Sequence, residues 1–132
     1  MDVALLPPPQ RLLLELCRRS PVDPFPDAVP PGARPEALLE ELTKLAVRHS
    51  VQGLVLSRLM TPDGAVEPFG GLEDRIRPGL ALVTRQATLW DMEQDRVLTG
   101  LDRAHVRPLV LKGGALRRWV FARPVERAMG DL

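Results

Sequence analysis

The sequence has little of several things that would assign it to a particular class of protein. A single cysteine, Cys17, excludes an intramolecular disulfide and a metal site built from cysteines. A net charge of +1 does not produce the strong positive potential that binds nucleic acid non-specifically, so no DNA partner is indicated. No run of 18 apolar residues and no signal-peptide pattern occurs, so we expect a cytoplasmic protein with no membrane association.

The composition that remains is that of an ordinary globular protein. With 132 residues, 45% of them hydrophobic and 27% charged, the chain suits one soluble domain, or one domain and the beginning of another. A chain of this size can bury roughly two thirds of its unfolded surface, which is enough for one modest core. Cys17 lies in an apolar helical stretch, and we expect it to be a small buried side chain rather than a nucleophile.

Apolar residues at helical spacing predict an all-helical region over residues 1–107. Helices are expected at Gln10–Arg19, Glu36–His49, Val51–Met60 and from Leu80 to about His105. Between the first two, residues 21–35 hold six prolines and are typical of an exposed linker. The last of these prolines, Pro35, can serve as the first residue of the next helix, where its missing N–H costs nothing.

Two of these helices show clear apolar stripes. In the second helix, charged residues face outward (Glu36, Glu40, Glu41, Lys44) and apolar residues face inward (Leu38, Leu39, Leu42, Leu45, Ala46). In the longest helix the inward stripe is Val83, Ala87, Trp90, Val97, Leu98 and Leu101. We expect Trp90 in the core, with base stacking as the alternative.

Turn signals separate the helices. Thr61–Gly64 is expected to form a turn, and the pairs Gly70-Gly71 and Pro78-Gly79 are each expected to break the chain. The two histidines, His49 and His105, lie near predicted helix C-termini without partners at metal-ligand spacing, so we expect both to be structural.

Residues 108–132 have a different pattern. Pro108 ends the long helix, and Leu109–Leu111 is a short apolar run typical of a central strand. A glycine turn, a helix over Ala115–Phe121 and a second strand opening on Asp131 follow. The predicted fold class is α+β: a mainly helical N-terminal region over residues 1–107, followed by the first β-α-β of a second, incomplete core over residues 108–132.

The glycine turn is a candidate anion site. Gly113 and Gly114 follow a predicted strand and precede a helix, so their amides can approach a phosphate closely at the positive end of the helix dipole. The alternative is a simple strand-to-helix turn. A Walker-type loop is not indicated, because Lys112 precedes the glycines instead of following them.

Three charged residues flank this turn in the predicted topology. Asp131 opens a strand, where a carboxylate suits Mg²⁺, whose shell is completed by substrate phosphate oxygens. Arg127 could hold a phosphate or neutralise Asp131, and Lys112 could reach the same phosphate. The alternatives are a turn residue for Asp131, a solvated arginine, and a lysine whose chain only covers apolar surface.

Together, the segments Leu109–Leu116 and Arg127–Leu132 give the chain a family resemblance. They resemble the opening of the uncharacterised nucleotidyltransferase family, within the DNA polymerase β-type superfamily, where a Gly-Gly or Gly-Ser turn is followed by an Asp-x-Asp or Asp-x-Glu pair. The Lys-Gly-Gly run is also similar to the AbiE-type toxin nucleotidyltransferases. The helical N-terminal region matches the uncharacterised family better.

The resemblance implies Mg²⁺-assisted transfer of a nucleoside monophosphate from an NTP to an unknown hydroxyl acceptor, which could be a small molecule, a protein or RNA. Gly113 and Gly114 would bind the β- and γ-phosphates, with Lys112 and Arg127 nearby, and Asp131 would be the first metal ligand. Gly114 stands where many relatives have serine. The second carboxylate would fall at position 133, so we expect this chain alone not to turn over NTP, and its C-terminal segment to be poorly stable.

Two other functions remain open at this point. The chain could be a non-catalytic helical interaction module, in which Gly113-Gly114 is only a turn and the stripe from Val83 to Leu101 docks a partner. It could also be a toxin-like nucleotidyltransferase acting on tRNA, although the net charge of +1 gives that reading no particular support.

Overall fold

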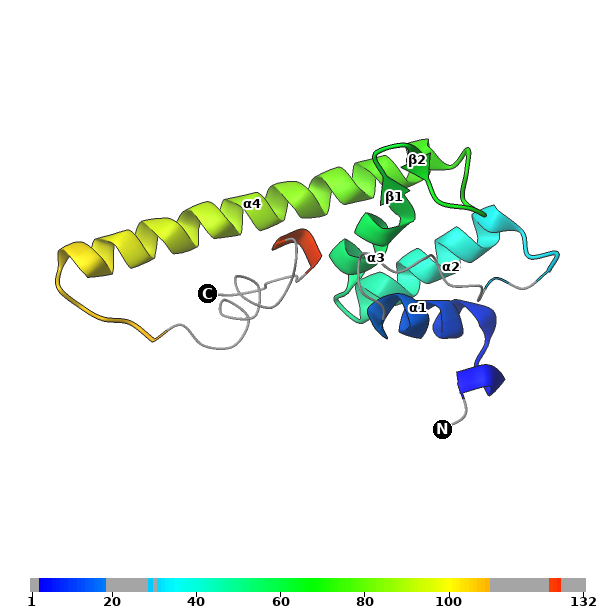
Figure 1. Ribbon diagram of the computed structural model, residues 1–132, viewed down its shortest axis with the longest axis horizontal. Helices are drawn as coiled ribbons and strands as arrows, with labels where there is room; N and C mark the ends of the chain where they lie inside the picture. Colours follow the sequence, from blue (N-terminus) through cyan, green and yellow to red (C-terminus); the bar gives the residue numbers. More distant parts are fainter. Residues whose placement is uncertain (1–2, 19–28, 30, 110–123, 127–132) are drawn as a thin grey trace.

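The computed structural model of the protein describes residues 3–18, 29, 31–109 and 124–126. In chain order its elements are η1 (Val3–Leu5), α1 (Pro8–Arg18), α2 (Pro35–Arg48), α3 (Gln52–Leu59), β1 (Met60–Thr61), β2 (Gly64–Ala65), α4 (Glu73–Arg103) and η2 (Pro124–Glu126). Helices α1, α2 and α3 pack together, and the long helix α4 projects from this group (Figure 1). Helices combined with a two-stranded antiparallel sheet confirm the α+β class.

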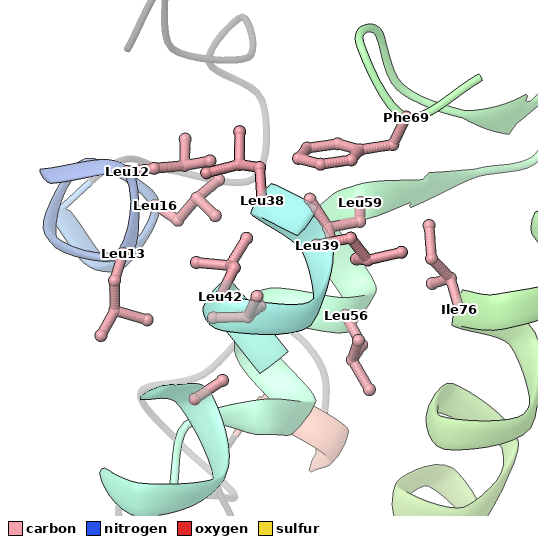
Figure 2. Packing of buried hydrophobic residues seen from close by; sticks show 12 residues of the cluster. Leu12, Leu13, Leu16, Leu38, Leu39, Leu42, Leu56, Leu59, Phe69 and Ile76 are labelled. Carbon is pink, nitrogen blue, oxygen red and sulfur yellow. The ribbon is translucent and has the colours of Figure 1, made fainter. Parts of the chain in front are cut away.

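The core lies where α1, α2 and α3 meet the start of α4. Figure 2 shows the α1 leucines on one side of α2, and the side chains of α3, Phe69 and Ile76 on the other. The buried cluster consists of Leu12, Leu13, Leu16, Leu38, Leu39, Leu42, Ala46, Val55, Leu56, Leu59, Phe69 and Ile76. The three N-terminal helices predicted from apolar spacing are therefore confirmed.

Helix α2 agrees with its prediction in detail. It begins at Pro35, whose fixed φ and missing N–H suit the first helical position. Its predicted inward residues are buried, or partly buried in the case of Leu45, while its predicted outward residues Glu36, Glu40, Glu41 and Lys44 are exposed. The linker before it falls largely outside the described residues.

Helices α2 and α4 end in the same way, on a residue in the left-handed region. Ser50 follows α2 with a φ of 55° and His105 follows α4 with a φ of 57°. In α4 the N–H of Val106 donates to the carbonyl of Leu101 at 2.9 Å, as in a Schellman motif. Glycine is the usual residue at such a position and is the sequence signal for it. His105 stands there in α4, so the only sequence signal for the end of this helix was the later Pro108.

The predicted turn at 61–64 is confirmed, and it joins two strands that the sequence did not predict. In this hairpin Met60 pairs with Ala65 and Thr61 with Gly64, and the Thr61 hydroxyl donates to the Gly64 carbonyl at 3.0 Å. Gly64 has a φ of 129°, a conformation that favours glycine. Strands of two residues are too short for an alternating pattern to reveal them.

The chain break predicted at Pro78-Gly79 is wrong. Helix α4 begins at Glu73 and continues through Pro78 without interruption. Ile76 is 1% exposed and Leu80 packs against the core, so tertiary contacts on both sides of Pro78 hold this turn in place despite the missing hydrogen bond. Gly79 lets α3 approach closely, since a Cβ there would lie 3.1 Å from Leu56 Cδ1.

The predicted apolar stripe of α4 is covered only in part. Ala87 is buried, whereas Val83, Trp90, Leu98 and Leu101 are half-buried and Val97 is 41% exposed. Trp90 is therefore not a fully buried core residue. The predicted strand that follows α4 begins at Leu109, which lies in irregular chain and is 80% exposed; the remainder of the predicted β-α-β falls on residues outside the described ranges, apart from η2.

Candidate functional site

The residues predicted to bind nucleotide and metal lie outside the described part of the chain. These are Lys112, Gly113, Gly114, Arg127 and Asp131. The structure does, however, describe the chain on both sides of them. Leu109 precedes the predicted phosphate-binding turn, and η2 directly precedes Arg127. The position of η2 is therefore the structural information that bears most closely on the predicted site.

The short helix η2 packs against two helices from the N-terminal region. It contacts α3 and α4, and lies between them in the view of Figure 1, where it is drawn in red. Glu126 is only 4% exposed, and Val125 is partly buried. Residues 124–126 are thus held against the helical region immediately before Arg127, the last of the predicted phosphate-binding residues along the sequence.

The contact between η2 and α3 depends on the absence of a side chain at Gly53. A Cβ at this position would lie 1.7 Å from the carbonyl oxygen of Val125 and 2.9 Å from its carbonyl carbon. Real Cβ atoms do not approach backbone this closely, so any residue other than glycine would displace η2 or α3. Gly53 lies in the first turn of α3, where glycine otherwise weakens a helix. A glycine inside the predicted helix 51–60 was the one sequence signal for this contact.

Electrostatics also favours a carbonyl at this place. Helix α3 begins after Val51 without a side-chain cap. The first N–H groups of a helix lack partners within the helix and carry partial positive charge, which favours the negative end of a nearby carbonyl dipole. Val125 presents its carbonyl oxygen to this first turn.

Buried polar groups occur on both helices that contact η2. Among residues 3–18, 29, 31–109 and 124–126, the buried side-chain oxygen of Gln52 in the first turn of α3 has no hydrogen-bond partner, and neither has the Nε2 of Gln94 on α4. Gln94 is 9% exposed. A buried polar atom without a partner lowers the free energy of unfolding, so both side chains are expected to reduce the stability of the helical region.

Glu73 has a structural role. Its Oε1 accepts hydrogen bonds from the backbone N–H groups of Ala65 at 3.2 Å and Gly71 at 3.3 Å. Hydrogen bonds from its own N–H and from those of Ala65 and Gly71 lower the pKa of the Glu73 carboxyl. Glu73 therefore ties the hairpin to the start of α4.

The prediction that Cys17 is buried is wrong. The preceding residue on α1, Leu16, is buried, but the Cys17 side chain is exposed. Packing of part of the side chain raises the pKa of the Cys17 thiol, and the smaller opposing effect of Arg58 does not reverse this. A raised pKa keeps the group as a thiol at neutral pH, so Cys17 lacks the activation expected of a catalytic nucleophile.

Other predicted features can be located in the described ranges. His49 and His105 both lie at helix C-termini, as expected. Within residues 3–18, 29, 31–109 and 124–126, no group of three His, Cys, Asp or Glu residues is arranged to hold a metal ion. Asp131 lies outside these ranges, so the Mg²⁺ site stays a prediction. Among the helices described, none has the length and apolar character needed to cross a bilayer.

The chain was compared with models of protein families. Residues 35–132 match the model of a family described as an uncharacterised nucleotidyltransferase. The match begins at the first residue of α2, so it includes α2, α3 and α4 as well as η2 and every predicted site residue. Neither the curated proteins nor the solved structures gave a match.

Proposed function

Since the chain belongs to the uncharacterised nucleotidyltransferase family, we propose that its C-terminal segment supplies the phosphate-binding turn and the first metal carboxylate of a Mg²⁺-dependent nucleotidyltransferase. The observation that carries the proposal is the family match over residues 35–132, which spans the motif from Lys112 to Asp131. The substrate is an NTP, and the acceptor is a hydroxyl group of unassigned origin.

Each residue of the motif has a chemical task in this proposal. The backbone amides of Gly113 and Gly114 bind the β- and γ-phosphates, and Gly114 has no hydroxyl with which to assist. Arg127 and Lys112 offset the negative charge of the triphosphate. Asp131 is an oxygen ligand of the kind that Mg²⁺ prefers, and the bound ion would hold the triphosphate and stabilise charge on it during transfer.

The reaction itself is an in-line displacement. The acceptor oxygen forms a bond to the α-phosphorus of the NTP while the bond from that phosphorus to the bridging oxygen breaks. Pyrophosphate leaves with the electron pair, and the acceptor's proton passes to a base or to solvent. Holding the triphosphate in a fixed position is the contribution that Lys112, Gly113, Gly114 and Arg127 make to this step.

Nucleotide binding tests the proposal directly, because the sequence contains the first of the two motif carboxylates. Calorimetric titration of ATP into the protein, with and without Mg²⁺, is compared for the original chain, Asp131→Asn and Asp63→Asn. Asp63 is an exposed carboxylate in the hairpin turn and serves as the matched control. We expect Mg²⁺ to tighten ATP binding in the original chain and in D63N, and D131N to lose that gain, roughly tenfold or more in Kd.

A helical interaction module is the second candidate, and one observation favours it. Helix α4 exposes Leu82, Leu89 and Met92, which are 67%, 56% and 64% exposed. These residues lie outside the apolar stripe from Val83 to Leu101, which was the docking surface expected from the sequence. The same titration separates the two functions, because a module of this kind has no reason to bind ATP or to respond to Mg²⁺. If the original chain binds none of ATP, GTP, CTP and UTP, the enzymatic proposal fails.

A further inference from the structure

We propose that Gly53 is a positioning residue for the nucleotide site: by admitting the Val125 carbonyl to the first turn of α3, it fixes the segment that leads into Arg127 and Asp131. This inference rests on the proposed function, because it assigns a role to a residue of the helical region in nucleotide binding. It gives that region a task beyond forming a core.

The first step of the argument is the uniqueness of this contact among the glycines described. At Gly79 and Gly70 an added Cβ would meet only side-chain atoms, at 3.1 Å and 2.8 Å, and these can move. At Gly100 it would meet nothing within 4 Å. Only at Gly53 does it meet backbone, at 1.7 Å from Val125 O, and backbone can yield only if η2 moves relative to α3.

The second step is that η2 has support from more than one side. It packs against α4 as well as α3, and Glu126 is 4% exposed. Acidic residues are rarely buried to this extent, so the burial of Glu126 indicates that η2 is docked on the helical region. The three residues of η2 are therefore held at a defined place on the helical region.

The third step concerns what docking can control. Consecutive Cα atoms are about 3.8 Å apart by covalent geometry, so we expect docking of η2 to restrict the positions open to Arg127. Asp131 is five residues beyond Glu126 and has a reach of up to about 18 Å. Loss of docking should therefore affect phosphate binding through Arg127 more than metal binding through Asp131.

Two helical glycines provide the matched experiment. Gly53→Ala adds a methyl group where Val125 lies, and Gly100→Ala adds the same group on α4 where space is open. ATP affinity is measured by calorimetry with and without Mg²⁺ in both variants, and circular dichroism reports helix content. We expect G53A to weaken ATP binding roughly tenfold in both conditions, since misplacement of a binding group by about 1 Å can have effects of this size or larger. G100A should bind as the original chain does.

The dependence on Mg²⁺ distinguishes positioning from other effects. G53A should retain the ratio of affinities with and without Mg²⁺, because Asp131 is unchanged, whereas D131N should abolish that ratio. A helix-rich G53A protein that binds ATP as tightly as the original chain would overturn the inference. Binding by the original chain and G100A in that case would leave the proposed function standing, while no binding of ATP, GTP, CTP or UTP by either would remove both.

A second variant covers the case in which G53A does not fold. Glu126→Gln keeps the volume of the buried side chain and removes its charge, and it leaves the core leucines untouched. We expect E126Q to weaken ATP binding in the same direction, again with and without Mg²⁺. Unchanged affinity in a folded E126Q would count against control of the site by η2 and would overturn the inference.

Discussion

Helix α3 is much shorter than α4, yet more of its residues are buried. Helix α3 has 8 residues, of which Gly53, Leu54, Val55, Leu56, Ser57 and Leu59 are buried. Helix α4 has 31 residues, of which only Ile76, Ala87 and Gln94 are buried. The short helix touches α1, α2, α4, β1 and η2, whereas the long one extends away from the helical group (Figure 1).

The difference shows what holds each helix in place. A helix that is buried on most sides is held by its tertiary contacts, and an isolated segment of eight residues would not stay helical in water. Helix α4 has a covered start and an extended remainder, which depends more on local interactions such as the exposed pair of Glu93 and Arg96, with Arg96 Nε 2.9 Å from Glu93 Oε2. We therefore expect α3 to be sensitive to substitution at almost every position and α4 to be sensitive at few.

The sharpest contrast should come from the same substitution made in each helix. Leu59 on α3 is 0% exposed, and Leu89 on α4 is 56% exposed. Leu59→Ala leaves a cavity in the core and should lower the free energy of unfolding by about 2–5 kcal/mol. Leu89→Ala should change it by less than about 0.5 kcal/mol. Urea unfolding followed by circular dichroism measures both, and equal losses would show that the exposed face of α4 is covered in solution.

A smaller effect should come from the buried amide of α4. Within the described part of the chain Gln94 Nε2 has no hydrogen-bond partner, so this group bears a desolvation cost without compensation. Gln94→Met has a similar volume and no polar group, and it should raise the free energy of unfolding by about 1 kcal/mol. Thermal and urea unfolding test the direction. A clear loss of stability in Q94M would mean that the amide does have a partner in solution.

The smallest effect concerns the hairpin that joins the two helices. Because the folded protein lowers the pKa of Glu73, the contribution of this carboxylate to stability is present above its ordinary pKa of 4.5 and is lost as the pH falls through the lowered value. Melting temperature should therefore decrease from about pH 5 to pH 2. Glu73→Gln should make this decrease shallower while leaving the neutral-pH fold intact, and an unchanged acid profile would argue against the hydrogen bonds to Gly71 and Ala65.

The sequence predicted features that depend on neighbouring residues. Apolar spacing placed α1, α2 and α3, and Pro35 marked the start of α2, because helix periodicity and proline geometry act locally. The break at Pro78 was wrong for the opposite reason: Ile76 and Leu80 hold that turn through contacts with distant parts of the chain. The exposure of Cys17 likewise depends on how α1 sits on its neighbours.

The candidate site follows the same rule. Local signals were sufficient to single out Gly113, Gly114 and Asp131 as a motif, and the family match includes them. No local signal could connect Gly53 with Val125, because their contact joins two segments that are far apart along the chain. A glycine within a predicted helix shows that something unusual happens there, but only the fold identifies what fills the space.

The contact between Gly53 and Val125 also determines when, during synthesis of the chain, the first turn of α3 can be covered. Residue 53 leaves the ribosome about seventy residues ahead of residue 125, a lag of roughly 4–15 s at ordinary rates of translation. Throughout this interval the leucines of α1, α2 and α3 have all been synthesised, yet the opening turn of α3 has nothing to cover it. The growing polypeptide is therefore open to unwanted association at this turn until residues 124–126 have been synthesised and can pack on α3.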